Sequence, residues 1–205
     1  MSDDSLRRLA FVANNADCEF PSMITLTYPS EFPCSGVEVK RHLNHFLLCL
    51  KRHLGKVLYL WFLEFQKRGA PHFHILLSVG LPEDRWDRGL EYAWLSNTWY
   101  RVVGSGDEKH LQAGTRWEDL REVEGGRHYV VKYASKTYQK QVPGGFRDVG
   151  RFWAHSLALT VTPLSIHAVS EGEIRQSLSE WPYLESTGAF MPRVLYNAAR
   201  FWQPT

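Results

Sequence analysis

The strongest constraint on the fold comes from two strand-like segments on either side of a short turn. Residues 57–66 are almost entirely apolar, and residues 72–79 alternate between polar and apolar side chains at their start. The intervening Lys67–Pro71 contains glycine and proline, which favour turns. Two such runs joined by a short glycine-containing loop are typical of a β-hairpin. The chain is therefore expected to contain an antiparallel pair of strands.

The flanking segments extend this pattern. Ser22–Tyr28 is rich in β-branched residues and ends before a proline, which predicts a strand. Ser35 has capping-box spacing to Glu38 and predicts a helix that ends at Gly55. Further predicted elements are a helix over 84–101 that buries Trp86, Leu90 and Trp94, a polar loop over 104–114, a helix over 128–141, a strand over 151–161 and a helix over 171–180.

This order of elements predicts an α+β fold with a central antiparallel sheet, flanking helices and a ferredoxin-like architecture. The sequence contains no repeat, low-complexity tract or long linker. We expect one domain over residues 1–165, with residues 166–205 as a helical or irregular C-terminal extension of the same domain.

Composition excludes several classes of protein. The longest apolar run, Val57–Leu63, is far shorter than the roughly 20 residues of a membrane span, so no membrane association is expected. The acidic segment Met1–Asp4 is unlike a secretory signal, so a cytoplasmic location is expected. The three cysteines lack C-x-x-C spacing, which favours neither a disulfide framework nor a thiolate zinc site.

Positive charge is concentrated in two segments, although the net charge is only +2. Residues 37–81 contain seven Lys and Arg against two Glu, and residues 109–162 contain nine against five acidic residues. If the two segments form one surface, it would suit a polyanion such as a nucleic acid.

Two histidines separated by one residue are the first chemically informative feature. Side chains alternate along a strand, so His72 and His74 project from one face and Phe73 from the other. Neutral imidazole is the commonest metal ligand in proteins, and such a pair can bind one ion together with a third ligand.

The preceding strand offers Glu64 and Gln66 for that third position. A hairpin symmetric about Gly69 would place Glu64 opposite His74 and Gln66 opposite His72, whereas a one-residue slip would put Glu64 on the wrong face. Glu64 is the stronger choice because a carboxylate carries charge. Gln66 remains an alternative ligand or a group that orients a ligand.

A doubled Tyr-x-x-Lys unit is the second feature. Tyr129, Lys132, Tyr133 and Lys136 fall within about 100° of arc on the predicted helix. A phenol has a pKa of about 10, yet it can attack phosphorus if a cation stabilises the phenolate and a metal withdraws charge from the phosphate. Lys136 can supply that cation to Tyr133. Taken alone, such a face is also ordinary helix packing.

Together the two features predict a transesterification in which a tyrosine becomes linked to a 5′ phosphate and a 3′ hydroxyl is released. His72-Phe73-His74 resembles the signature of the HUH endonuclease superfamily, and the tyrosine segment resembles the tyrosine motif of its rolling-circle replication initiators. Two further stretches are similar to motifs of the phage and plasmid members, in the same order: Met23–Tyr28 and Gly150–Trp153.

This resemblance implies an HUH fold of ferredoxin-like or RRM-like kind, Mn²⁺ or Mg²⁺ as cofactor, and single-stranded or hairpin origin DNA as substrate. By the family's pattern, Glu64, His72 and His74 would bind the metal. Tyr133 would be the nucleophile with Lys136 as its partner, and Tyr129, beside Lys132, would be a second nucleophile or a packing residue. The sequence lacks G-x-x-x-x-G-K-[ST], so a separate helicase is expected as partner.

Three other functions compete with this interpretation. A transposase or relaxase would use similar histidines and tyrosines. A non-catalytic domain that binds single-stranded nucleic acid would explain the basic segments without needing the histidine pair. A histidine-triad nucleotide hydrolase is disfavoured because Leu76 stands where a third alternating histidine would be.

Overall fold

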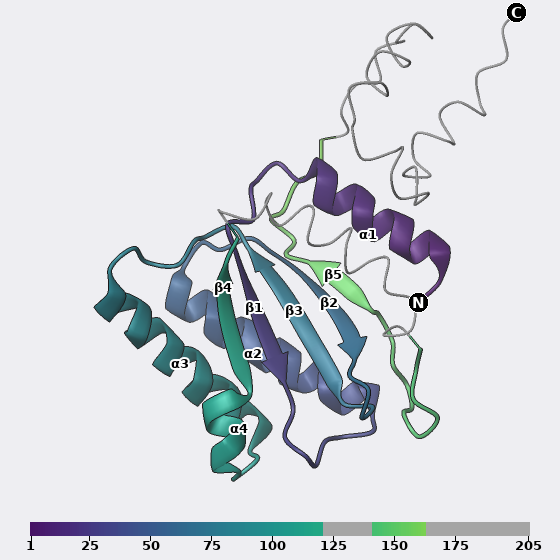
Figure 1. Ribbon diagram of the computed structural model, residues 1–205. Helices are drawn as coiled ribbons and strands as arrows, with labels where there is room; N and C mark the ends of the chain where they lie inside the picture. Colours follow the sequence, from purple (N-terminus) through teal and green to yellow (C-terminus); the bar gives the residue numbers. More distant parts are fainter. Residues whose placement is uncertain (121–140, 163–205) are drawn as a thin grey trace, which may run out of the picture. The chain divides into compact units, whose positions relative to one another are not determined.

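Within the described residues, five strands form one antiparallel sheet in the order β4-β1-β3-β2-β5 (Figure 1). The structure is a computed structural model and describes residues 1–120 and 141–162. The strands are β1 (Ser22–Thr27), β2 (Tyr59–Phe65), β3 (Pro71–Leu77), β4 (Thr115–Asp119) and β5 (Trp153–His155). The helices are α1 (Asp3–Asn15), α2 (Gly36–Leu54), α3 (Arg85–Val103) and α4 (Glu108–Ala113).

The connections form two interlocked split βαβ units. α2 links β1 to β2, and β3 lies between those two strands; α3 and α4 link β3 to β4, and β1 lies between that pair. This is the ferredoxin-like arrangement, with β5 added beside β2. The predicted α+β fold, with a central antiparallel sheet and flanking helices, is confirmed.

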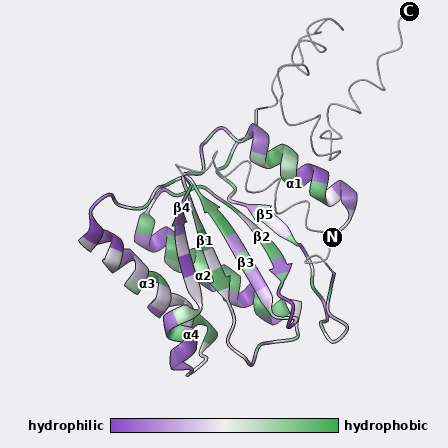
Figure 2. Ribbon diagram, viewed as in Figure 1, coloured by the Kyte–Doolittle hydropathy of each residue, from purple (hydrophilic) through white to green (hydrophobic). Residues whose placement is uncertain are grey.

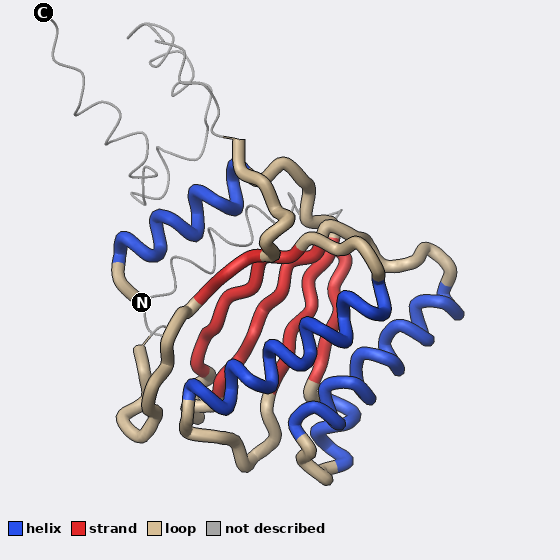
Figure 3. The backbone as a smooth tube through the Cα atoms, turned by 180° about the vertical axis from the view of Figure 1, so that it is seen from behind, coloured by secondary structure: helices blue, strands red, loops and turns tan. Residues whose placement is uncertain are grey.

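One face of the sheet is covered by α2 and α3. Seen from behind, α2 lies in front of the strands with α3 alongside (Figure 3). The core on this face joins alternate residues of the strands, such as Phe73 and Ile75 of β3, to the apolar stripe of α2 and to Trp99 of α3. The buried residues of that stripe are Val39, Leu43, Phe46, Leu47 and Leu50.

The opposite face is covered at one end by α1. Leu9 and Ala13 of this helix share a second core with Met23 of β1, Leu60 of β2 and Leu76 of β3. Hydrophobic residues accordingly predominate in the central strands, whereas the edge strand β4 is largely hydrophilic (Figure 2). Toward the other end of this face the strands carry polar side chains, which form the site described below.

The hairpin register differs from the predicted one by two residues. Glu64 pairs with His72, and Phe62, rather than Glu64, pairs with His74. The loop consists of Lys67, Arg68 and Gly69, and Gly69 has a φ of 82°, as the last residue of a three-residue hairpin loop commonly does. Because the shift is even, Glu64 stays on the predicted face.

The other differences concern packing and short elements. Trp86 and Leu90 of α3 were expected to be buried but are 78% and 56% exposed, because the part of α3 that packs into the core is its C-terminal half, through Leu95 and Trp99. The Ser35 hydroxyl makes no cap hydrogen bond to the described backbone, although α2 begins beside it. The predicted strand over 151–161 is reduced to β5, and the sequence did not predict α1, α4 or β4.

Some predicted elements lie outside the described residues. These are the helix over 128–141, except for its last residue, the helix over 171–180, and the proposed C-terminal extension. None of the helices found in the described parts of the chain is long and apolar enough to cross a membrane.

Candidate functional site

The two histidines of β3 lie on the sheet face that α1 partly covers, as the alternation predicts. Their ring centroids are 4.6 Å apart and the rings are tilted by 76°. His74 is also stacked on Phe62, its partner on β2, with 4.9 Å between ring centroids. Residues 72 and 74 are therefore held side by side at the centre of the sheet, between β1 and β2.

Glu64 of β2 joins the histidines from the neighbouring strand. It pairs directly with His72, yet its side chain reaches His74: Oε2 lies 3.3 Å from Nε2 of that imidazole. Both side chains are almost completely buried, each residue being 3% exposed. The sequence prediction that these three residues share one face is confirmed, with the closest contact running diagonally across the hairpin.

Access to the cluster increases toward the end of the sheet where β2 meets the hairpin turn. His74 and Glu64 are buried, whereas His72 is half-buried. Burial, and to a smaller extent the neighbouring His74, lowers the pKa of His72 from 6.5 to about 3. The imidazole is thus neutral at neutral pH, which is the form that binds metal ions.

Two threonines of β1 complete the cluster from its other side. Thr25 pairs with His74 and Thr27 pairs with His72. The Oγ1 of Thr25 is 3.3 Å from Nδ1 of His74, and the Oγ1 of Thr27 is 3.0 Å from Nδ1 of His72. Sequence reasoning missed both threonines. The signal was present in the alternation of Thr25-Leu26-Thr27, which matches that of His72-Phe73-His74.

Gln66 approaches His72 from the hairpin turn. Its Nε2 lies 3.4 Å from Nδ1 of His72, and its Oε1 accepts a hydrogen bond of 3.0 Å from Nε of Arg68. The guanidinium of Arg68 also donates to the carbonyl oxygens of Tyr28 and Pro29. Gln66 therefore lies on the Nδ1 side of the ring, as expected of a residue that orients the histidine.

The donor set of two imidazoles and a carboxylate is suited to a divalent cation. Adjacent ligands of an octahedral ion with bonds of about 2.1 Å lie about 3 Å apart, which is close to the 3.3 Å between His74 Nε2 and Glu64 Oε2. Among the described residues, no three His, Cys, Asp or Glu side chains form a complete ligand group. The chemistry and spacing of the His74–Glu64 pair thus fit a cation, with His72 beside it.

The predicted nucleophile and its neighbours fall outside the described residues. Tyr129, Lys132, Tyr133 and Lys136 all belong to residues 121–140. Their roles stay predictions.

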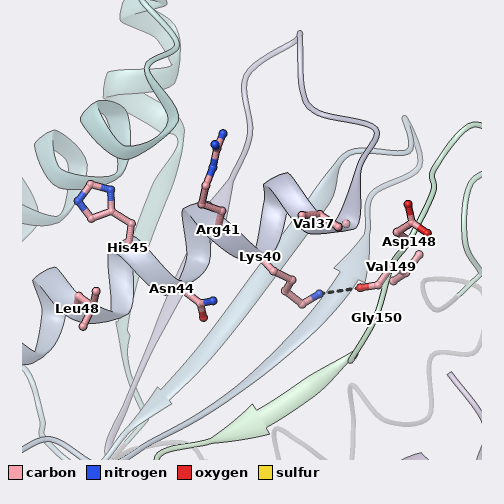
Figure 4. Close-up of a pocket in the computed structure, with 10 residues that line it drawn as sticks. Val37, Lys40, Arg41, Asn44, His45, Leu48, Asp148, Val149 and Gly150 are labelled. Atoms are coloured by element: carbon pink, nitrogen blue, oxygen red, sulfur yellow. Dashed lines mark hydrogen bonds between the residues drawn. The ribbon is translucent and has the colours of Figure 1, made fainter.

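A hollow of about 600 Å³ lies elsewhere on the surface, along α2 and the loop before β5 (Figure 4). It contains none of the histidine cluster, and α2 packs on the opposite sheet face. Its lining residues are Gly36, Val37, Lys40, Arg41, Asn44, His45, Leu48, Asp148, Val149 and Gly150. The hollow is therefore distinct from the site formed by His72, His74 and Glu64.

Comparison with known proteins identifies the family. The model of the replication-associated protein family that includes ORF2 matches residues 21–138, more than half of the chain. The chain belongs to this family. The matched part of this replication-associated protein runs from β1 to the doubled Tyr-x-x-Lys unit and includes the whole histidine cluster. No curated protein and no solved structure gave a significant match.

Proposed function

We propose that this replication-associated protein is a metal-dependent endonuclease that nicks and rejoins DNA to initiate rolling-circle replication. The observation that carries the proposal is the presence of His72, His74 and Glu64 on one sheet face, with His74 and Glu64 in contact, within the segment that matches the family. The resemblance to HUH endonucleases, and to their rolling-circle initiators, points to the same chemistry.

In this proposal, His72, His74 and Glu64 hold Mn²⁺ or Mg²⁺. When bound, the cation withdraws charge from the scissile phosphate and stabilises the leaving 3′ oxygen. Burial of His74 and Glu64 strengthens their electrostatic interaction with a cation, since the surroundings screen charge less than water does. The half-buried His72 leaves the cluster accessible from the turn.

The proposed nucleophile is the phenolic oxygen of Tyr133. Its attack on phosphorus forms a tyrosine–phosphate bond and breaks the bond to the 3′ oxygen, so the number of phosphodiester bonds is unchanged. The proton lost by the phenol is balanced by the proton gained by the 3′ oxygen. Lys136 stabilises the phenolate, and Tyr129 with Lys132 provides a second such pair for a further strand transfer.

The proposed substrate is single-stranded or hairpin origin DNA. Lys67 and Arg68 are exposed at the hairpin turn, next to the accessible end of the cluster, where their charges would attract phosphates. Unwinding by a separate helicase remains an expectation from the sequence.

A covalent-adduct assay tests the proposal. The full chain is incubated with Mn²⁺ and single-stranded DNA from its parent replicon, denatured in SDS, and separated by electrophoresis. We expect a slower-migrating protein–DNA band that EDTA abolishes. His74→Ala should remove the band, whereas the matched control His45→Ala, at an exposed position of α2, should retain it.

The tyrosine variants separate the two phenols. Loss of the adduct in Tyr133→Phe alone would identify a single nucleophile, and an adduct that persists until Tyr129 is also changed would show that either phenol can react. An adduct of undiminished yield in His74→Ala would contradict the metal site. Tight DNA binding without an adduct, across several sequences and both metals, would favour a non-catalytic nucleic-acid-binding domain.

A further inference from the structure

The two histidines are held in the same way by the neighbouring strand. Each imidazole presents Nδ1 to the hydroxyl of its own cross-strand threonine: His74 to Thr25 at 3.3 Å, and His72 to Thr27 at 3.0 Å. The same contact therefore occurs twice, at positions two residues apart on each strand. It follows from the pairing of the two strands rather than from one side chain.

We propose that Thr25 and Thr27 are positioning residues that hold the two imidazoles by Nδ1 and leave Nε2 of each ring for the cation. The inference rests on the proposed function, because it concerns the same metal ligands. It adds a role for β1, which supplies no ligand itself. Partners of this kind fix the orientation of metal-binding histidines in many sites.

A hydroxyl is suited to this position because it both donates and accepts hydrogen bonds. In the metal-free chain, Nε2 of His74 faces a carboxylate oxygen of Glu64, which only accepts. When Glu64 is ionised and this ring is neutral, the proton belongs on Nε2, and Thr25 donates to Nδ1.

His72 follows the same logic. Arg68 donates to Oε1 of Gln66, which leaves the amide N–H₂ of Gln66 facing Nδ1 of His72 at 3.4 Å. Nδ1 is then an acceptor, and the proton is again on Nε2. Binding of a cation at Nε2 requires the proton on Nδ1, and each threonine hydroxyl can reverse from donor to acceptor while the ring keeps its orientation. A valine side chain can neither donate nor accept a hydrogen bond.

The position of Thr27 is itself fixed by the segment between β3 and β4. Its carbonyl oxygen accepts hydrogen bonds from Nε1 of Trp99 at 2.7 Å and Nε2 of His110 at 2.8 Å. Its N–H donates to the carbonyl oxygen of Gly114 at 2.8 Å. Helices α3 and α4 thus hold the end of β1 at the residue that contacts His72.

Metal binding by the full chain provides the test. Mn²⁺ affinity is measured by calorimetry for the wild type, Thr25→Val/Thr27→Val and Thr25→Ser/Thr27→Ser. We expect the valine pair to weaken binding about 10- to 100-fold and the serine pair to stay within about threefold of wild type. Thr115→Val is the matched control, because Thr115 lies on β4 and its hydroxyl contacts Ser96 rather than a histidine.

Valine preserves the β-branched shape, and circular dichroism verifies folding; if the double variant does not fold, Thr27→Val alone replaces it. A valine variant that folds and binds Mn²⁺ within about twofold of wild type would overturn the proposal, since the expected loss is about tenfold or more. So would a serine pair that binds as weakly as the valine pair, since the hydroxyl would then not be the active feature.

A second measurement does not depend on metal binding. Long-range ¹H–¹⁵N correlation spectra of the metal-free chain report which ring nitrogen carries the proton. We expect Nε2–H in both rings of the wild type, and Nδ1 signals in the valine variants that shift as expected for the loss of a hydrogen-bond donor. If the wild type binds no Mn²⁺ but the valine variants shift the Nδ1 signals, the proposed function fails and the ring-positioning role stands. Unchanged Nδ1 signals would refute the positioning role, whatever the wild type binds.

Discussion

Lys40 carries a charge into the apolar layer between α2 and the sheet. Its Nζ lies 5.3 Å from the centroid of the Trp61 ring and 5.6 Å from that of Phe73, and donates a hydrogen bond of 3.2 Å to the carbonyl oxygen of Val149 (Figure 4). Burial of the ammonium group lowers the pKa of Lys40 from 10.5 to about 8. The shift predicts how the stability of the protein depends on pH.

The direction of the effect follows from proton binding. Because the pKa is lower in the folded state, the unfolded chain binds more protons between pH 8 and 10.5, so Lys40 makes stability rise with pH in that window. The full penalty, present below about pH 8, is about 3 kcal/mol, from the shift between 10.5 and about 8 at about 1.4 kcal/mol per pKa unit. About 1 kcal/mol of it should be relieved between pH 7 and pH 9.

Lys40→Met removes the titrating group while keeping a long, flexible side chain. Urea unfolding of both proteins is followed at pH 7, 8 and 9, and the difference in unfolding free energy is compared across pH. We expect the unfolding free energy of the wild type, relative to that of the variant, to rise by about 1 kcal/mol between pH 7 and pH 9, since other groups titrate equally in both proteins. A difference that stays constant, or that moves in the variant's favour, would refute the assigned burial of the charge.

Three further substitutions test the packing of α3 and α4. Trp99→Phe removes the donor to the Thr27 carbonyl and part of a fully buried ring, and should lower the free energy of unfolding by about 2 kcal/mol in urea titrations. Trp86→Ala, at a side chain that is 78% exposed, should change it by less than about 0.5 kcal/mol; equal effects at the two tryptophans would contradict the burial described for α3. Gly114→Ala would bring a methyl group to 2.4 Å from Cδ2 of His110, so we expect the free energy of unfolding to fall by about 1–3 kcal/mol in thermal or urea unfolding. Unchanged stability would show that α4 can shift to accommodate the methyl group.

The hairpin illustrates which part of the site follows from local pattern. Alternation places His72, His74 and Glu64 on one face for any even register, so the prediction survived a two-residue error in pairing. The register itself depends on the loop, where Gly69 adopts a left-handed conformation that closes the turn after three residues rather than five. Glycine permits several loop lengths, so the local sequence did not specify the register.

The α3 helix illustrates the opposite case. Its first turns lie away from the sheet, so Trp86 and Leu90 have no core to enter (Figures 1 and 3). Spacing alone cannot reveal this, because an apolar pair at a helical interval looks the same whether or not another element lies beneath it.

Local signals were enough to predict the three long strands, the ferredoxin-like order of elements, and the face on which the candidate metal ligands lie, because each follows from the two-residue period of a strand or from short-range turn and cap signals. The residues that surround those ligands could be found only from the folded chain. Thr25 and Thr27 meet histidines 49 and 45 residues away, and His110 reaches the Thr27 carbonyl across 83 residues. Such contacts depend on which strands become neighbours, and strand adjacency is set by the packing of the whole sheet rather than by any local pattern.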